Sequence, residues 1–186
     1  ELGASDLRER GLSDKDLVVR LEASVRTPYV VGGLVYAKAT GCKTIAIACN
    51  QGSKIGEGAD LAIEPVPGPE VLTGSTRLKA GTVQKLILNM ISTGAMVKIG
   101  KVYQNLMVDV RQTNEKLVVR GQNIVMEATG CTRERAIQAL ADAGGHVKTA
   151  IVSVLLGCDA EQAAVALERA RGHGRAAVSG HETSNG

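Results

Sequence analysis

Hydroxyl and basic side chains gather in two segments at a spacing that suits anion binding. The segment SVRTP holds Ser24, Arg26 and Thr27, and the segment EVLTGSTRLKAGT holds Glu70, Ser75, Thr76, Arg77 and Lys79. Hydroxyl groups beside a helix start can bind phosphate oxygens, while helix N–H groups and the helix dipole favour negative charge. Guanidinium and ammonium groups neutralise the remainder. The residue types therefore indicate a phosphate site, although each segment alone is equally consistent with helix capping.

These segments, with the polar stretch Asn50–Ser53, follow three predicted strands. The apolar runs at 17–21, 44–48 and 61–63 have strand length, and the middle run suits a parallel sheet covered on both faces. A predicted helix separates the first two strands, with Thr27 as its cap and Gly41 at its end, which favours a right-handed crossover. Ligands bind beyond the carboxyl ends of such strands, so three polar loops are expected at one sheet edge.

The remaining chain is predicted to be mainly helical. A long, largely buried helix is expected from about 76 to 99, an ambiguous apolar stretch at 103–110, and another helix at 114–129. Three short amphipathic helices follow at 132–170, with Thr132 and Asp159 as caps. We expect a larger domain at 1–130, a small helical domain at 131–171 docked on it or on a partner, and a frayed tail at 172–186.

Composition excludes several classes of protein. The 186 residues are 44% hydrophobic and 22% charged with a net charge of +3, which suits a soluble globular chain. No apolar run nears the ~20 residues of a membrane helix, so a cytoplasmic location is expected. The chain has no Phe or Trp on which bases could stack, so nucleic-acid binding is disfavoured. The spacing of Cys42, Cys49, Cys131 and Cys158 suits no metal site, and four reduced thiols are expected.

Longer segments carry a family resemblance. The strand-SxRTP-helix unit, EVLTGSTRLKAGT, NLMVDVRQTNEKL and ATGCTRERAIQALADAGGHVKTAIVSVLLG resemble the sugar isomerase (SIS) family, and within it the bacterial N-acetylmuramic acid 6-phosphate etherases. The resemblance extends to about Gly174. It implies an α/β fold, a three-layer αβα sandwich with a parallel flavodoxin-like sheet, followed by a small ubiquitin-associated-like helical unit.

The same resemblance implies a lyase of cell-wall recycling. Enzymes of this family remove D-lactate from a phosphorylated amino sugar by elimination across an ether, followed by addition of water, and work as homodimers. No metal and no organic cofactor is implied. The family's catalytic glutamates lie upstream of Glu1, so we expect this chain to be a fragment that is inactive alone. For Glu70, substrate contact or loop anchoring is favoured over catalysis.

The first loop departs from the family pattern. Arg20 stands where a glycine is expected, and Val25 replaces the glycine of AASGRTP, which obstructs close approach of backbone to phosphate. Arg20 and Glu22 share one strand face and need charge partners. These departures leave open a non-catalytic phosphosugar-binding regulatory module of the same fold. A less favoured alternative is an aldose-ketose isomerase that uses Glu70 as its base.

Overall fold

The computed structural model describes residues 2–23 and 28–182, with side chains up to Gly180. Tertiary contacts divide the chain into two compact units, Glu1–Met90 and Ile91–Gly186. The sequence placed the boundary near 130 instead. The difference arises because helix α5 (Glu115–Thr129), expected in the larger domain, packs against α6 and α7 of the helical unit.

The first unit is built on a parallel three-stranded sheet. Strands β1 (Leu17–Glu22), β2 (Lys43–Ala48) and β3 (Leu61–Ile63) lie in the order β1-β2-β3, so the three predicted strands are confirmed. Helix α2 (Pro28–Ala39) links β1 to β2, and the short α3 (Lys54–Glu57) links β2 to β3. The α/β class is therefore confirmed, while the expected cap Thr27 lies outside the described residues.

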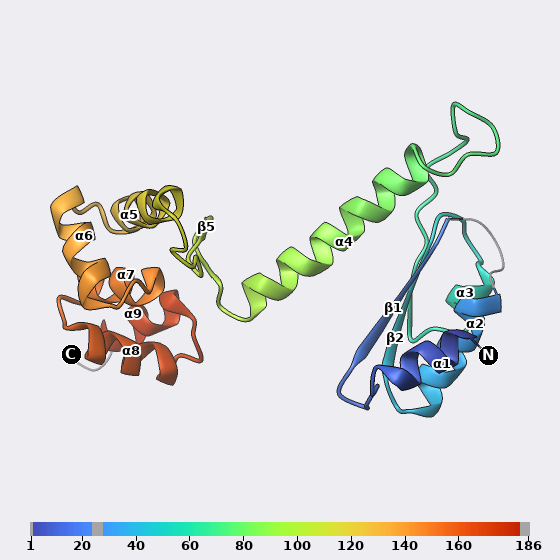
Figure 1. Ribbon diagram of the computed structural model, residues 1–186, viewed down its shortest axis with the longest axis horizontal. Coiled ribbons are helices and arrows are strands. Elements are labelled where there is room, and N and C mark those ends of the chain that lie inside the picture. Colours follow the sequence, from blue (N-terminus) through green and yellow to red (C-terminus); the bar gives the residue numbers. More distant parts are fainter. Residues whose placement is uncertain (1, 24–27, 183–186) are drawn as a thin grey trace. The chain divides into compact units, whose positions relative to one another are not determined.

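Helices cover one face of this sheet. Arg20 pairs with Ala46 and Glu22 with Ala48, so these residues form rows on a single face. Ala46 and Ala48 pack there against Ile55 of α3, and Figure 1 shows α2 and α3 beside the same strands. The second face leaves apolar side chains exposed, so the expected cover on both faces is at most partial: Leu17 is 51%, Leu21 38% and Leu61 52% exposed.

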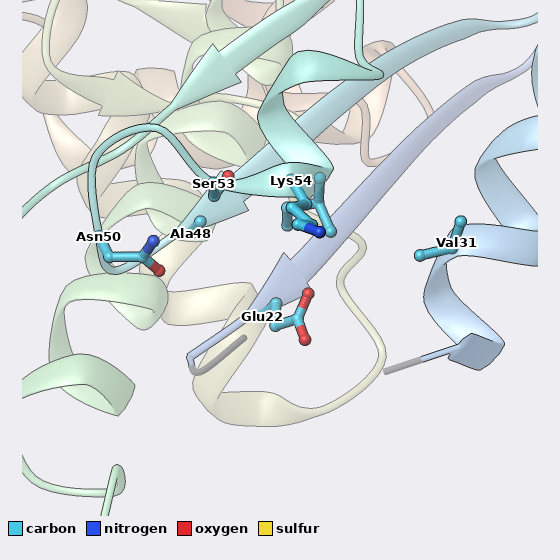
Figure 2. A pocket seen from close by; sticks show the side chains of 7 residues that line it. Glu22, Val31, Ala48, Asn50, Ser53 and Lys54 are labelled. Carbon is cyan, nitrogen blue, oxygen red and sulfur yellow. The ribbon is translucent and has the colours of Figure 1, made fainter. Parts of the chain in front are cut away.

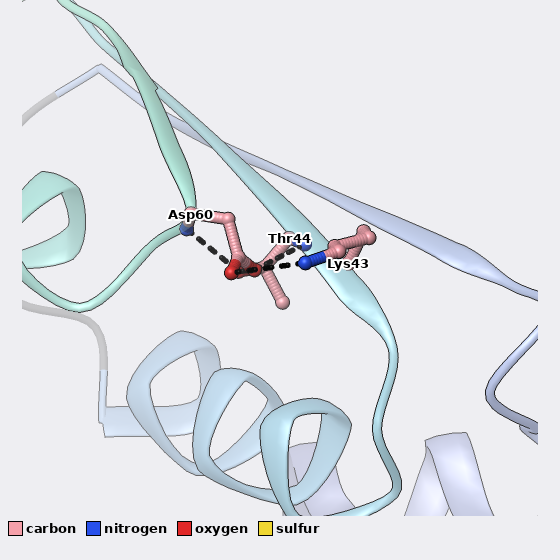
Figure 3. A network of polar contacts seen from close by, with 3 residues as sticks. All are labelled: Lys43, Thr44 and Asp60. Atoms are coloured by element: carbon pink, nitrogen blue, oxygen red, sulfur yellow. Dashed lines mark hydrogen bonds and ion pairs between the residues drawn. The ribbon is translucent and has the colours of Figure 1, made fainter.

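Polar side chains tie the start of β3 to the start of β2 (Figure 3). The Thr44 hydroxyl donates to Asp60 Oδ2 at 2.6 Å and the Thr44 N–H donates to the same oxygen at 2.8 Å. The Asp60 N–H donates back to Thr44 Oγ1 at 3.0 Å, and Lys43 Nζ lies 4.0 Å from Asp60 Oδ1. These hydrogen bonds hold the pKa of Asp60 below its usual value, so the tie is formed by the ionised carboxylate.

Helix α1 (Leu2–Glu9) packs closely on α2. The Tyr29 hydroxyl donates to Asp6 Oδ2 at 2.6 Å, and the Arg8 guanidinium lies 5.2 Å from the centre of the Tyr36 ring. At Gly3 a side chain is excluded, because a Cβ atom would collide with the Tyr29 carbonyl. The two helices are therefore held by polar contacts and by direct backbone approach.

Helix α4 (Lys79–Lys98) is as long as predicted but is not largely buried. Ala80 and Ile87 are its buried residues, whereas Leu86, Met90 and Val97 are 48%, 65% and 49% exposed. The correction has a physical reason, because the apolar residues of this helix are spread around its circumference rather than gathered on one face.

The second unit is mainly helical. A short antiparallel hairpin of β4 (Val102–Tyr103) and β5 (Leu106–Met107) precedes α5, which resolves the ambiguous stretch 103–110. Helices α6 (Arg133–Asp142), α7 (Val147–Leu156) and α8 (Ala160–Arg169) match the three predicted helices. Thr132 and Asp159 accept hydrogen bonds from the third residue of α6 and of α8, so both predicted caps are confirmed. The core shared by α5, α6 and α7 contains Val125, Ala136, Leu140, Val147 and Ile151.

The expected frayed tail is instead helical as far as it is described. Helix α9 (Gly174–Glu182) contacts α7 and α8, and its Ala177 is buried with Val152, Ala163 and Leu167. Packing of this small side chain into an existing apolar cluster stabilises a segment whose composition alone suggests disorder. Among residues 2–23 and 28–182, no single helix is long and apolar enough to cross a membrane; α6 and α7 would pass only as a pair, and that pair is bent by 114°.

Candidate functional site

The carboxyl ends of β1 and β2 and the start of α3 enclose a small hollow (Figure 2). Its volume is about 40 Å³, and it is lined by Glu22, Val31, Ala48, Asn50, Ser53, Lys54 and Ile55. This is the sheet edge at which a ligand was predicted, because the strands end there and the loops begin. The hollow is large enough for a few water molecules, each of which needs roughly 15 Å³, but not for a whole sugar phosphate.

Three elements contribute the polar groups of the hollow. Glu22 ends β1, Asn50 follows β2, and Lys54 opens α3, and Figure 2 shows the three side chains around the same space. A carboxylate, an amide and an ammonium group together offer both donors and acceptors. The arrangement suits hydroxyl and phosphate groups of a sugar more than an apolar ligand.

Glu64 fixes the loop beside the hollow. Its carboxylate accepts hydrogen bonds from the Gly52 N–H at 2.9 Å, the Ser53 N–H at 2.9 Å and the Ser53 hydroxyl at 2.6 Å. Ser53 Oγ in turn accepts from the Gly56 N–H at 3.0 Å and caps α3. A Cβ atom at Gly56 would come within 2.3 Å of the Glu64 carboxylate, so this position requires glycine.

The contacts of Glu64 have an electrostatic consequence. Hydrogen bonds from Ser53 and Gly52 hold the pKa of Glu64 below its usual range, so the group is an anion at neutral pH. The N–H groups of this loop are therefore already satisfied by an internal carboxylate. Sequence reasoning missed Glu64, although its position directly after β3, at the carboxyl end of a strand, was an available signal.

Glu70 caps α4. Its two carboxylate oxygens lie 3.0 Å from the Lys79 N–H, and Oε1 also accepts from the Ala80 N–H at 3.1 Å. These bonds lower the pKa of Glu70, which makes it a weaker base than an ordinary carboxylate. Of the roles considered for Glu70, loop anchoring is the one that these contacts support.

Cys49 joins the second polar loop to the third. Its thiol donates to the Ala80 carbonyl at 3.8 Å, at the first turn of α4. Burial and the nearby charge of Glu70 raise the pKa of Cys49, so the sulfur stays a protonated thiol at neutral pH. The structure thus brings two of the three predicted loops together, and Cys49 serves there as a packed polar contact rather than a nucleophile.

The other predicted site residues are placed less closely. Ser24, Arg26 and Thr27 lie outside the described residues, as does Val25. Ser75 is half-buried, while Thr76, Arg77 and Lys79 are exposed. Helix α4 begins at Lys79, so Ser75 and Thr76 precede its first turn by several residues, and Glu70 fills the capping role that sequence reasoning allowed Ser75.

Metal chemistry and thiol chemistry find little support in the described residues. No group of three or more His, Cys, Asp or Glu side chains there could hold a metal ion. All four cysteines are free thiols, as predicted. The hollow and its loops are therefore a polar surface built for hydrogen bonding and charge.

Known proteins give this geometry a context. The chain is 63% identical over 155 residues to the N-acetylmuramic acid 6-phosphate etherase of Cronobacter sakazakii, a match covering 83% of this chain and 52% of that protein. It is 57% identical over 180 residues to that of Erwinia tasmaniensis, covering 97% and 59%. The match to that of Oenococcus oeni is 58% over 155 residues, covering 83% and 52%. No protein-family model matches the chain.

The chain spans about half the length of the curated relatives that it matches. Identity above one half over most of the chain is far too extensive to arise from shared helix and strand patterns alone. By its sequence, this chain belongs to the family of the N-acetylmuramic acid 6-phosphate etherases.

Proposed function

We propose that the protein acts on N-acetylmuramic acid 6-phosphate as an etherase and releases D-lactate. The observation that carries the proposal is the sequence identity to curated etherases over most of the chain. The polar hollow at the carboxyl end of the sheet supports it, because this is where an α/β protein binds a small polar ligand. The SIS-type αβα sandwich and a small helical domain after residue 130 are part of the same proposal.

In this proposal the described chain supplies part of the substrate-binding surface. Ser24, Arg26 and Thr27, with Ser75, Thr76, Arg77 and Lys79, bind the phosphate and hydroxyl groups. Their hydroxyl groups donate to phosphate oxygens and their cations balance its charge. Glu70 acts by fixing the start of α4, so that the loop carrying these side chains has one defined end.

The proposed reaction needs an acid and a base. In the elimination step the bond from C2 to hydrogen and the ether bond from C3 to oxygen break, a carbon-carbon double bond forms, and the lactate oxygen gains a proton. Water then adds, with hydroxyl at C3 and hydrogen at C2. Two carboxyl groups suit these proton transfers. Glu70 is a poor base because its oxygens already accept hydrogen bonds and its pKa is lowered.

Part of the proposal concerns what 186 residues do alone. We expect them to bind the phosphosugar without turnover, because acid and base are proposed to lie elsewhere in the longer protein. We also expect the whole protein to pair with a second copy, an arrangement supported by exposed apolar side chains along α4 such as Met90 and Leu86.

Calorimetric titration tests the proposed binding. N-acetylmuramic acid 6-phosphate should bind the chain, and the unphosphorylated sugar should bind at least tenfold more weakly, since a phosphate contact to Arg is charge-assisted. Arg77→Gln should weaken binding, while Arg135→Gln, on the distant helix α6, should not. Equal affinity for both sugars would contradict the phosphate assignment. Enzymatic detection of D-lactate completes the test, because release by these residues alone would place the acid and base within them.

A further inference from the structure

Arg20 is a buried cation whose hydrogen-bonding groups are unused among the described residues. The residue is 6% exposed, and its Nε, Nη1 and Nη2 atoms are buried without a hydrogen-bond partner there. Burying a charge without satisfying its donors is costly, and such groups are normally paired. Burial lowers the pKa of Arg20, and the charge of Glu22 acts in the opposite direction, yet a guanidinium remains protonated in proteins. A buried cation with idle donors needs a ligand.

A cavity adjoins this residue. Its volume is about 260 Å³, and its walls come from α1, β1 and α2: Gly3, Leu7, Val18, Val19, Arg20, Leu21, Tyr29, Val30 and Gly33. It shares no lining residue with the rim hollow. Arg20 lies on the same strand face as Glu22, which meets α2 at Val31 in that hollow, so the Arg20 side chain is directed to the helix-covered face.

The lining decides which ligand fits. Arg20 is the one charged residue among the lining residues, and the remaining walls are aliphatic except for Tyr29, whose hydroxyl already donates to Asp6. One positive charge balances one negative charge, which favours a monoanion over a phosphate dianion. A guanidinium fork matches the two oxygens of a carboxylate, and aliphatic walls favour a ligand with a short apolar body.

We propose that the cavity between α1, β1 and α2 binds a small aliphatic monocarboxylate through the guanidinium of Arg20. The carboxylate accepts the N–H groups that the chain leaves unused, and its apolar part packs against the Leu7 and Val30 side of the cavity. This site is independent of the proposed etherase activity, since it is built from residues that the substrate loops do not contain.

Thermal unfolding with propionate as the probe tests the site. A ligand that binds the folded chain alone raises its Tm, and we expect a rise of about 5 °C at saturation relative to sodium chloride of equal ionic strength. Propionamide, which has the same shape without the charge, should give no rise. In NMR spectra of the unmodified chain, the Nε–H signal of Arg20 should shift with propionate.

Variants separate the guanidinium from the cavity. Arg20→Met removes the charge and keeps the length, and it should abolish the response to propionate while raising the Tm of the ligand-free chain. Arg10→Met, at an exposed arginine after α1, is the matched control and should respond like the unmodified chain. If Arg20→Met does not fold, Arg20→Lys and the NMR signal still decide the question, the lysine variant keeping a reduced Tm response.

Three results would overturn the proposal. The Tm could rise equally in propionate and in chloride, the Nε–H signal of Arg20 could stay fixed, or Arg20→Met could respond as the unmodified chain does. A larger Tm rise with inorganic phosphate than with propionate would replace the carboxylate by an inorganic anion. None of these results depends on turnover of a phosphosugar, so this inference and the proposed function fail separately.

Discussion

In residues 91–186 each capped helix begins beside its own capping side chain, whereas in residues 2–90 the elements are held by carboxylates from distant loops. Asn114, Thr132 and Asp159 each accept from an N–H three residues ahead. Glu70 reaches nine residues to α4, and Glu64 reaches 12 residues to Gly52. The helical unit is thus specified locally, while the unit that carries the candidate site depends on the path of the chain.

The two units also differ in their interiors. The helical unit has a continuous apolar core in which Val125, Ala136 and Ala150 are fully buried. The sheet unit has a smaller buried cluster of Ala46, Ala48 and Ile55, and it holds the unpaired guanidinium of Arg20 beside a cavity. Stability is therefore concentrated in one unit, and polar groups available to ligands in the other.

The largest expected effect comes from the helical core. Ile151→Ala should lower the free energy of unfolding of residues 91–186 by about 2 to 5 kcal/mol, because Ile151 is 1% exposed and its truncation leaves a cavity. Ile137→Ala, at a side chain that is 47% exposed, should cost less than about 1 kcal/mol. Denaturant unfolding measures the free energies, and hydrogen exchange shows which amides respond. Equal acceleration of exchange in β2 would erase the contrast between the units.

A smaller effect is expected at a local cap. Asp159→Ala removes the capping box that Asp159 forms with Gln162 and should cost about 1 kcal/mol, with faster amide exchange confined to the first turn of α8. Glu168→Ala, at an exposed residue in the last turn, serves as the control. Exchange that accelerates far from α8 would show that this cap is not a local device.

The smallest effect is expected in the loop beside the hollow. Glu64→Gln should speed amide exchange at Gly52 and Ser53 several-fold without changing the Tm measurably, because it weakens charge-assisted hydrogen bonds in an exposed loop. Glu57→Gln, at an exposed residue of α3, is the matched control. If exchange at both amides were unchanged, the tie from Glu64 would contribute nothing to the loop.

The same pair of variants gives a pH signature. Because the pKa of folded Glu64 is lowered, its contribution is fully present above the ordinary carboxyl pKa of about 4.3 and is lost as the pH falls through the lower folded value. Amide chemical shifts of Gly52 and Ser53 should therefore titrate below about pH 4 in the unmodified chain and in Glu57→Gln. They should show no such transition in Glu64→Gln.

Much of the fold could be predicted because its signals are short-range. The three strands, helix α2 and helices α5 to α8 were anticipated from periodicity and capping residues within a few positions of each element. The candidate site was anticipated less well. The loop after β2 and the capping loop before α4 do meet through Cys49, but Glu64, Asn50 and Lys54 were not singled out.

The sequence by itself determined where strands and helices form, which caps begin them and which family the chain belongs to, because each of these depends on residues close together in the chain or on identity to relatives. Only the tertiary structure decided which N–H groups Glu64 and Glu70 accept from, how exposed α4 is, and that Arg20 is buried without a partner. The physical reason is that a side chain's partner and solvent exposure depend on which distant segments the folded backbone brings within a few ångströms.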